Sequence, residues 1–206
     1  EKKVEAMKDG RMPIYEPGLD VLFERNIKQG RINFTTSLEE GIKGAKIIFL
    51  ALPTPPGEDG SADLSYVLGV AEELGKIITD YKVIVDKSTV PVGTAEQVHI
   101  AVAKNATVDF DIVSNPEFLR EGFAVDDFLK PERIIIGSSS DKATEQMKKL
   151  YKNILDSIES EHIDGVEKHK NSRVLIVDGL NTFIRCWSAV PTMNDDGDHV
   201  ALVVGL

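Results

Sequence analysis

The sequence predicts an α/β fold with a partial, doubly wound parallel sheet, and two patterns support this prediction. Between residues 30 and 155, short apolar segments alternate with longer segments of helical periodicity, which is typical of strand-helix-strand units. The middle apolar segments are nearly continuous, as expected for strands buried on both faces. A chain of 206 residues, 42% of them hydrophobic, is long enough to bury a core. The expected strands are residues 32–35, 46–52, 82–88, 110–114 and 133–137.

Four helices are expected beside these strands, at residues 19–28, 64–79, 94–104 and 142–155. In the second of them, apolar residues recur at helical spacing, so one face can pack on a sheet. Asp63 is the expected N-cap of this helix, because a carboxylate accepts the N–H groups that a first turn leaves unpaired.

The composition changes after Leu155. Residues 156–171 are rich in acids and contain no aromatic residue, which is typical of a fraying helix end followed by a polar linker. A new strand-turn-helix pattern, RVLIVDGLNTF, then begins at Arg173. We therefore expect a main domain over residues 1–155, a polar junction over 156–171 and a short strand-turn-helix appendage over 172–206.

Charge and cysteine content narrow the possible functions. A formal net charge of −10 argues against binding to nucleic acid or to an anionic membrane surface. The single cysteine, Cys186, excludes an internal disulfide and a cysteine-based zinc site, and it fits a reducing compartment. No apolar segment reaches the length of about 18 residues that a membrane span needs. We expect a cytoplasmic protein with no membrane or nucleic-acid partner.

Polar side chains follow three successive expected strands, at the carboxyl ends where open parallel sheets bind ligands. The three segments are PTPPG at 53–57, KSTVPVGT at 87–94 and NPE at 115–117. Each combines hydroxyl, carboxamide or carboxylate groups with proline, which fixes φ and reduces the entropy lost when a ligand binds. We expect them to outline one crevice.

Each segment also has an ordinary structural explanation. Proline-rich loops after strands are commonly turns, and Ser and Thr commonly cap helices such as the one expected near Thr94. Glu117 and Glu121 lie four residues apart, and both would suit the exposed first turn of a helix, where acids favour the helix dipole. The coincidence at three successive strand ends favours a ligand site.

Four ordered motifs carry a more specific signal: MPIYEPGLDVLF at 12–23, FLALPTPPGEDGSADLSYV at 49–67, VIVDKSTVPVGT at 83–94 and DIVSNPEFLREGFAVDDFLKPERIIIG at 111–137. They resemble the NAD-dependent UDP-glucose 6-dehydrogenases, within the wider nucleotide-sugar 6-dehydrogenase family, and the resemblance covers residues 4–155. It implies a truncated, Rossmann-like NAD-binding domain. It also implies oxidation of UDP-glucose to UDP-glucuronate, with NAD as the cofactor and a UDP-sugar as the substrate.

The resemblance also implies roles for individual residues. Thr54 and Ser88 match positions that line the dinucleotide site, and Glu121 matches a residue beside the nicotinamide. Thr89 matches a threonine that holds a water near the reacting carbon, and Glu117 matches the carboxylate that exchanges protons with this water.

The backbone at Phe118 and Leu119 matches a lining of the sugar-nucleotide pocket. Because Glu117 and Glu121 are one helical turn apart, we expect both carboxylates on one helical face that points into the crevice. Burial among apolar neighbours such as Phe118 and Phe123 would raise the pKa of such a carboxylate and suit it to accept a proton.

Two parts of the family pattern have no counterpart in the sequence. No G-x-G-x-x-G turn is present, although the N–H groups of such a turn normally hold the pyrophosphate. The family's second oxidation uses a cysteine in a later domain, and Cys186 does not match that motif. We expect a chain that lacks the first strand-helix-strand unit, binds NAD weakly and is inactive by itself. The choice between NAD and NADP stays open.

Residues 172–206 depart from this pattern. Their first 28 or so residues resemble the start of the phage-type 5′-nucleases, a metal-dependent family in which the aspartate of a strand-ending VDG holds magnesium. Only under this alternative is a metal ligand expected, and it would be Asp178. A structural alternative is that Val174–Val177 pair beside residues 47–52 and replace the missing first unit.

Three functions therefore stay open. The first is the cofactor-binding part of a UDP-glucose 6-dehydrogenase, and the second is a chimeric or truncated fold without activity, which could need a complementing chain or a homo-oligomer. The third is the N-terminal piece of a metal-dependent 5′-nuclease. The first is favoured, because four motifs support it and only one supports the nuclease.

Overall fold

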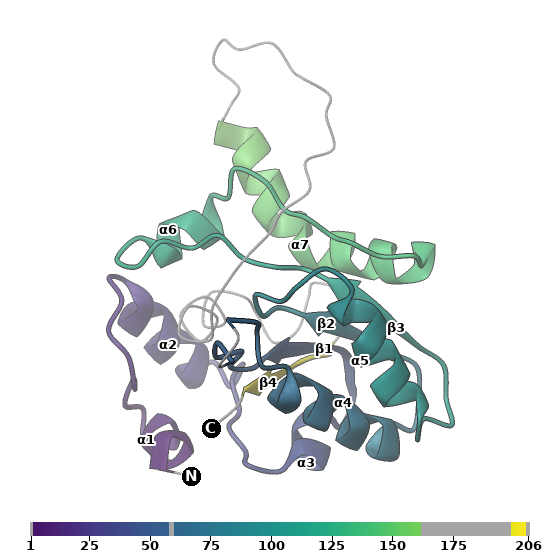
Figure 1. Cartoon of the computed structure of the whole chain (residues 1–206). Coiled ribbons are helices and arrows are strands. Elements are labelled where there is room, and N and C mark those ends of the chain that lie inside the picture. Colours follow the sequence, from purple (N-terminus) through teal and green to yellow (C-terminus); the bar gives the residue numbers. More distant parts are fainter. Residues whose placement is uncertain (1, 58–59, 162–198, 205–206) are drawn as a thin grey trace.

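The computed structural model describes residues 2–57, 60–161 and 199–204, and it contains one four-stranded parallel sheet (Figure 1). The strand order is β3-β2-β1-β4, with parallel pairing throughout. This confirms the predicted α/β fold. The strands are β1 (Ala45–Ala51), β2 (Lys82–Asp86), β3 (Phe110–Ser114) and β4 (His199–Val204).

Helices cover both faces of this sheet, which explains the nearly continuous apolar segments in the sequence. On one face, Ile48 and Leu50 of β1 belong to a buried cluster with residues of α4 (Ser65–Ile77) and α5 (Thr94–Ala103). On the other face, Ile47 and Phe49 pack with residues of α7 (Asp141–Glu161). Each large aliphatic side chain buried in this way contributes about 1.5–3 kcal/mol to folding.

The four predicted helices are all present. Helix α2 spans Leu19–Lys28, as predicted, and α4 and α5 agree with the predicted ranges to within two residues at each end. Helix α7 continues beyond the predicted end to Glu161, and so into the predicted polar junction. The sequence analysis did not predict three short helices: α1 (Lys2–Lys8), α3 (Leu38–Ile42) and α6 (Ala124–Leu129).

The predicted N-cap of α4 is wrong by one position. The N-cap residue is Leu64, and Asp63 precedes it. The Asp63 carboxylate still accepts the backbone N–H of Ser65 at 2.9 Å. This hydrogen bond lowers the pKa of Asp63 and satisfies one donor of the first turn.

Two of the five predicted strands are wrong. Residues 32–35 form no strand. In the described part of the chain, the sheet consists of β3, β2, β1 and β4 in this order, and residues 32–35 pair with none of them. Residues 133–137 make only an isolated antiparallel bridge, between Gly137 and Ser114. The bridge does not extend, because the carbonyl of Ile135 accepts the side-chain amide of Asn115 at 2.8 Å.

Strand β4 was not predicted. It pairs with β1 on the side of β1 that faces away from β2. Its pairing runs from Ala45 with His199 to Ala51 with Val204 and shifts register once, between Ala45 and Ile47. A segment near the C-terminus therefore satisfies the outer backbone groups of β1. Val174–Val177, the segment expected in this place as a structural alternative, lies outside the described residues, as do Asp178 and Cys186.

None of the described helices combines the length and the apolar character that a membrane-spanning helix requires.

Gly75 marks the closest approach between α4 and α5. It is buried, and a Cβ placed on it would lie 2.3 Å from the carbonyl oxygen of Val102. Backbone atoms on the facing helix cannot move aside as a flexible side chain would. Gly69 is on the same helix, and a Cβ placed there would have no heavy atom within 4 Å.

We predict that Gly75→Ala lowers the free energy of unfolding by about 2 kcal/mol, because it forces α4 and α5 apart. Gly69→Ala is the matched control. It should raise the free energy of unfolding by about 0.5–1 kcal/mol, because alanine is the better helix former and meets no clash there. Urea titration followed by circular dichroism measures both values. Equal stabilities for the two variants would contradict the proposed close approach.

Candidate functional site

The carboxyl ends of β1, β2 and β3 lie side by side at one edge of the sheet. Their register continues into the following loops, because the N–H of Lys87 donates to the carbonyl of Leu50 at 3.0 Å and the N–H of Asn115 donates to the carbonyl of Asp86 at 2.9 Å. The three polar segments of the sequence analysis therefore begin at neighbouring positions.

Two hydroxyl groups connect the loops after β1 and β2. The Ser88 hydroxyl is buried, donates to the carbonyl of Leu52 at 2.8 Å and accepts the N–H of Leu52 at 3.0 Å. The Thr54 hydroxyl donates to the backbone carbonyl of Thr89 at 3.0 Å. The side chain of Thr89 is exposed. Thr54, Ser88 and Thr89 thus lie together at one edge, although Ser88 uses its hydroxyl to hold the backbone.

A buried polar cluster lies beneath the loop after β3. The Lys87 ammonium donates to Asn115 Oδ1 at 2.9 Å and to the Tyr151 hydroxyl oxygen at 3.2 Å, and the Tyr151 hydroxyl donates to the same Asn115 oxygen at 2.6 Å. The exposed fraction of these three residues is 3% or less. Buried polar groups with these partners fix the start of the loop and join it to α7.

Asp86 ends β2 and is almost completely buried. Its Oδ1 accepts the N–H of Ser88 at 3.3 Å, and its Oδ2 has no hydrogen-bond partner among the described residues. Burial raises the pKa of Asp86 to about 7, and the hydrogen bond from Ser88 opposes part of this shift. The burial of Asp86, Lys87 and Asn115 was not predicted from the sequence, because burial of polar residues inside a motif depends on tertiary packing.

Glu117 and Glu121 do not share a helical face, so that prediction is wrong. Both lie in the irregular loop between β3 and α6, and the helix begins only at Ala124. Gly122, two residues before this helix, has a φ of 84°, a left-handed conformation that a right-handed helix cannot contain. Glu117 is 1% exposed, whereas Glu121 lies at the surface. One carboxylate is therefore buried and the other faces solvent.

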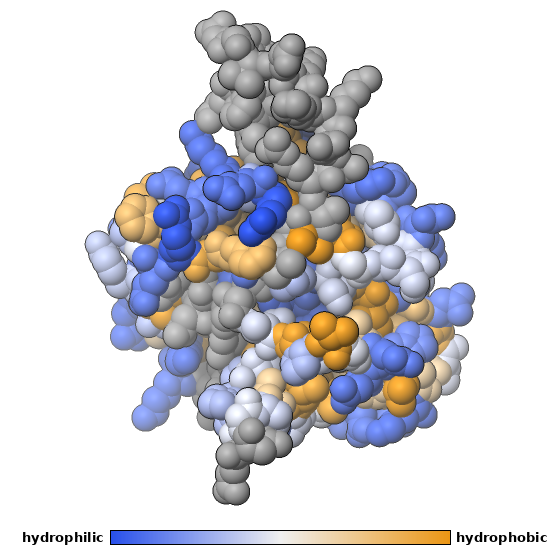
Figure 2. All heavy atoms as spheres, turned by 45° about the horizontal axis from the view of Figure 1, so that its top comes forward, coloured by the Kyte–Doolittle hydropathy of each residue, from blue (hydrophilic) through white to orange (hydrophobic). Residues whose placement is uncertain are grey.

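The apolar neighbours expected around Glu117 are themselves at the surface. Phe118 is 47% exposed and Phe123 is 58% exposed, and guanidinium groups lie over both rings. Figure 2 shows that apolar side chains on this face of the molecule form several separate patches with hydrophilic side chains between them. The expected enclosure of Glu117 by fully buried aromatic rings is therefore not what the structure shows.

Glu16 is the other buried carboxylate that the sequence analysis missed. It lies between α1 and α2 in the sequence and accepts backbone N–H groups of Gly122 and Ala124. Glu16 lies in the motif MPIYEPGLDVLF, which indicated the family resemblance but no role for this residue. Nothing local in that motif indicates a contact with residues more than 100 positions away.

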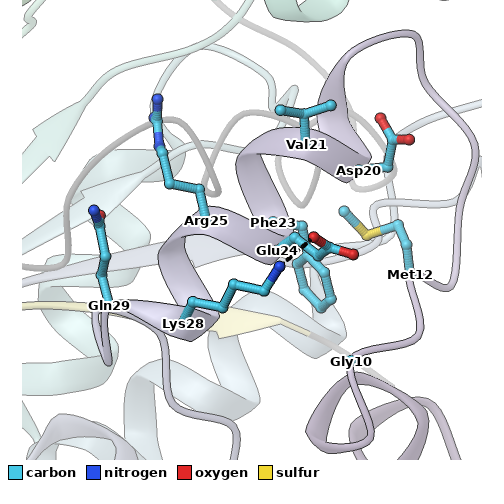
Figure 3. A pocket seen from close by; sticks show the side chains of 9 residues that line it. All are labelled: Gly10, Met12, Asp20, Val21, Phe23, Glu24, Arg25, Lys28 and Gln29. Atoms are coloured by element: carbon cyan, nitrogen blue, oxygen red, sulfur yellow. Dashed lines mark hydrogen bonds and ion pairs between the residues drawn. The ribbon is translucent and has the colours of Figure 1, made fainter.

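Two cavities lie away from the hydroxyl groups. One, of about 600 Å³, lies along α2, where Figure 3 shows Lys28 and Glu24 pointing toward each other. The other, of about 400 Å³, includes Phe118 and Leu119, the predicted substrate-binding residues. Neither includes Thr54, Thr89 or Glu117. The second is lined by Phe118, Leu119, Arg120, Asp127, Phe128, Lys130, Pro131, Glu132, Arg133, Ile134 and Tyr151.

In the part of the chain that the structure describes, no group of three or more His, Cys, Asp or Glu side chains is placed to hold a metal ion. The nuclease alternative depends on Asp178, which lies outside that part.

Comparison with known proteins identifies the family of this chain. Residues 1–155 match the model of the NAD binding domain of the UDP-glucose/GDP-mannose dehydrogenase family. The chain belongs to this family. The match covers the three strand ends and the loops described above, so the resemblance seen in the four motifs is confirmed.

Curated relatives support the same conclusion. The chain is 47% identical over 155 residues to a UDP-glucose 6-dehydrogenase of Pseudomonas aeruginosa, covering 73% of the chain and 34% of that protein. It is 46% identical over 153 residues to a UDP-glucose 6-dehydrogenase of Bacillus subtilis, covering 73% of the chain and 33% of that protein. The chain thus spans about one third of the length of these relatives.

Solved structures agree with the fold. A UDP-glucose dehydrogenase from the archaeon Pyrobaculum islandicum has a TM-score of 0.73 at 38% sequence identity, over 88% of this chain and 39% of that one. A GDP-mannose dehydrogenase from Pseudomonas aeruginosa has a TM-score of 0.68 at 26% identity, over 89% of this chain and 40% of that one.

Asp86 gives a prediction on pH dependence. The pKa of Asp86 in the folded chain, about 7, is higher than the ordinary value of 3.8 for an aspartate, so its ionisation opposes folding as pH rises from about 4 to about 7. We predict that Asp86→Asn, which cannot ionise, gains about 2.5 kcal/mol of unfolding free energy relative to the wild type between about pH 5 and pH 8.

Urea unfolding of both proteins at the two pH values measures this difference. Asp126→Asn, at an exposed position on α6, is the control and should stay close to the wild type at both pH values. A constant difference between Asp86→Asn and the wild type would show that Asp86 does not titrate in this range.

Proposed function

We propose that this chain is the NAD-binding part of an enzyme that oxidises UDP-glucose to UDP-glucuronate. The observation that carries the proposal is the arrangement of the loops after β1, β2 and β3. The hydroxyl of Thr54, in the loop after β1, donates to the carbonyl of Thr89, in the loop after β2. The loop that contains Glu117 begins at the end of the neighbouring strand, β3. Ligands of open parallel sheets bind at this edge. The family membership supports the same assignment.

Within this proposal, Thr89 and Glu117 are catalytic, and Thr54, Ser88 and Glu121 contact the cofactor. Oxidation of a primary alcohol removes a hydride and a proton. NAD, when bound, accepts the hydride. The Glu117 carboxylate accepts the proton through a water held by Thr89, and a buried carboxylate suits this role because few waters compete with it.

Phe118 and Leu119 contact the UDP-sugar in this proposal. Both line the cavity of about 400 Å³, whose lining also includes the basic residues Arg120, Lys130 and Arg133 and the acidic residues Asp127 and Glu132. Asp127 forms an ion pair with Arg120. Basic residues still outnumber acidic ones in this lining, and they lie beside apolar side chains, which supports recognition of an anionic nucleotide.

The described residues fit one end of NAD better than the other. The Thr54 hydroxyl donates its proton to the Thr89 carbonyl, so its oxygen can accept an N–H of the uncharged carboxamide of nicotinamide. A pyrophosphate needs several convergent N–H groups, and the sequence contains no G-x-G-x-x-G turn that would supply them. The proposal therefore includes weak binding of NAD, held mainly at its nicotinamide end.

We also propose the division of the chain into a domain over 1–155, a junction over 156–171 and an appended fragment over 172–206. The family match ends at residue 155, which supports the first boundary. The cytoplasm is the proposed location. A complementing chain or a second copy is the proposed partner.

A binding experiment tests the cofactor site. We predict that saturation-transfer NMR detects NAD in contact with the chain more strongly at the nicotinamide protons than at the adenine protons, with a Kd of about 1 mM. Thr54→Val should weaken this binding about threefold to tenfold, because it removes a hydroxyl and its bond to the loop after β2. Thr79→Val is the matched control, because Thr79 lies between α4 and β2, at the opposite edge of the sheet. Equal signals from both ends of NAD would contradict the proposed site.

Turnover tests the expected incompleteness. We predict that the 206-residue chain, incubated with NAD and UDP-glucose, produces no increase in the absorbance of reduced cofactor, because Cys186 lies outside the family match and the pyrophosphate turn is missing. A full-length family member is the positive control. Steady reduction of NAD by the chain alone would show that its described residues suffice for the first oxidation.

A further inference from the structure

Glu16 connects two segments that are distant in the sequence. Its Oε1 accepts the N–H of Ala124 at 2.7 Å, and its Oε2 accepts the N–H of Gly122 at 3.2 Å. The side chain is buried, with 3% of the residue exposed. Charge-assisted hydrogen bonds from a buried carboxylate are stronger than neutral ones and hold their donors in a defined geometry.

The donors belong to the end of the loop that carries Glu117 and Glu121. Helix α6 begins at Ala124, and its N-cap residue, Phe123, has no side chain that accepts a hydrogen bond. The first N–H groups of a helix need acceptors, and a negative charge is favourable beside them. Glu16 supplies this acceptor from another part of the chain.

A second carboxylate holds the same loop from within α6. Asp127 Oδ2 accepts the backbone N–H of Arg120 and its Nε–H, both at 3.0 Å, and Asp127 Oδ1 accepts the other arm of the guanidinium at 2.7 Å. Glu121 therefore lies between Arg120, which is held by Asp127, and Gly122, which is held by Glu16.

The start of the loop is fixed separately. Asn115 is bonded to Lys87, Tyr151 and the carbonyl of Ile135, so the backbone before Glu117 is anchored to the sheet and to α7. Hydrogen bonds therefore hold the segment at both ends, at Asn115 and at Gly122. The Glu16 contact reaches this loop from the N-terminal part of the chain.

We propose that Glu16 is a positioning residue that holds the 117–122 loop in the conformation that binds the UDP-sugar. This inference rests on the proposed function, because Phe118 and Leu119 are its substrate-binding residues. Glu16 acts through the N–H groups of Gly122 and Ala124 and does not contact the ligand itself. Loss of its charge releases the loop while the sheet and its core remain in place.

The test compares Glu16→Gln with Glu24→Gln. The first variant keeps the side-chain shape but removes the charge and turns one acceptor into a donor that faces an N–H group. The second is the matched control: Glu24 is also in the N-terminal part of the chain, but its side chain is 68% exposed and pairs with exposed Lys28. Neutralising such a surface pair has little effect.

Two measurements are made on each protein. Amide hydrogen exchange followed by NMR should be at least about tenfold faster at Gly122 and Ala124 in Glu16→Gln, with the amides of β1 unchanged. Titration with UDP-glucose should give a Kd about tenfold higher in the same variant. Glu24→Gln should match the wild type in both measurements, and Glu16→Asp, which keeps the charge, should recover part of the binding.

Each outcome decides between the alternatives. Unchanged exchange at Gly122 and Ala124 would overturn the inference, and so would faster exchange with unchanged UDP-glucose binding, since Glu16 would then be structural only. Failure of Glu16→Gln to fold would also overturn it, because the effect would not be confined to the loop. If the wild-type chain binds no UDP-glucose, the proposed function fails instead, and faster exchange limited to Gly122–Ala124 still supports the contact that holds the loop.

Discussion

Parallel pairing of β2 with its neighbours β1 and β3 is the constraint on which the rest of the structure depends. Parallel strands end at the same edge, so every loop that follows them begins at that edge. The pairing is stable because helices bury both faces, with α4 and α5 on one side and α7 on the other. Hydrophobic burial thus determines where the polar loops lie, and Tyr151 takes part in both, because its ring belongs to the apolar cluster and its hydroxyl to the polar one.

Buried polar side chains then give these loops a defined conformation. Lys87, Asn115 and Tyr151 form one cluster, and Glu16 and Asp127 each accept N–H groups of the loop after β3. Removing such groups from water is costly, and only well-placed partners compensate for it. The loop therefore combines one buried carboxylate, at Glu117, with exposed side chains on a backbone that accepting carboxylates hold at Arg120 and Gly122.

The same dry environment is unfavourable for Asp86. Its burial at the end of β2 favours the neutral acid, and a single weak hydrogen bond from Ser88 compensates only in part. An apolar residue at this buried position would be more favourable for folding than a carboxyl group. Retention of a carboxyl group beside the loops that are proposed to bind the cofactor fits the pattern in which perturbed acids cluster near functional sites.

The sequence by itself determined the fold class, three of the strands, four helices and the family. These depend on local periodicity and on ordered motifs, which are properties of neighbouring residues. Tertiary structure decided what local patterns cannot encode. Residues 133–137 form no strand, because Asn115 takes the carbonyl of Ile135. The carboxylates at 117 and 121 lie in a loop, because Gly122 adopts a left-handed conformation and Glu16, more than 100 residues away, accepts the N–H groups where α6 begins. Such contacts join segments that only the packed sheet brings together.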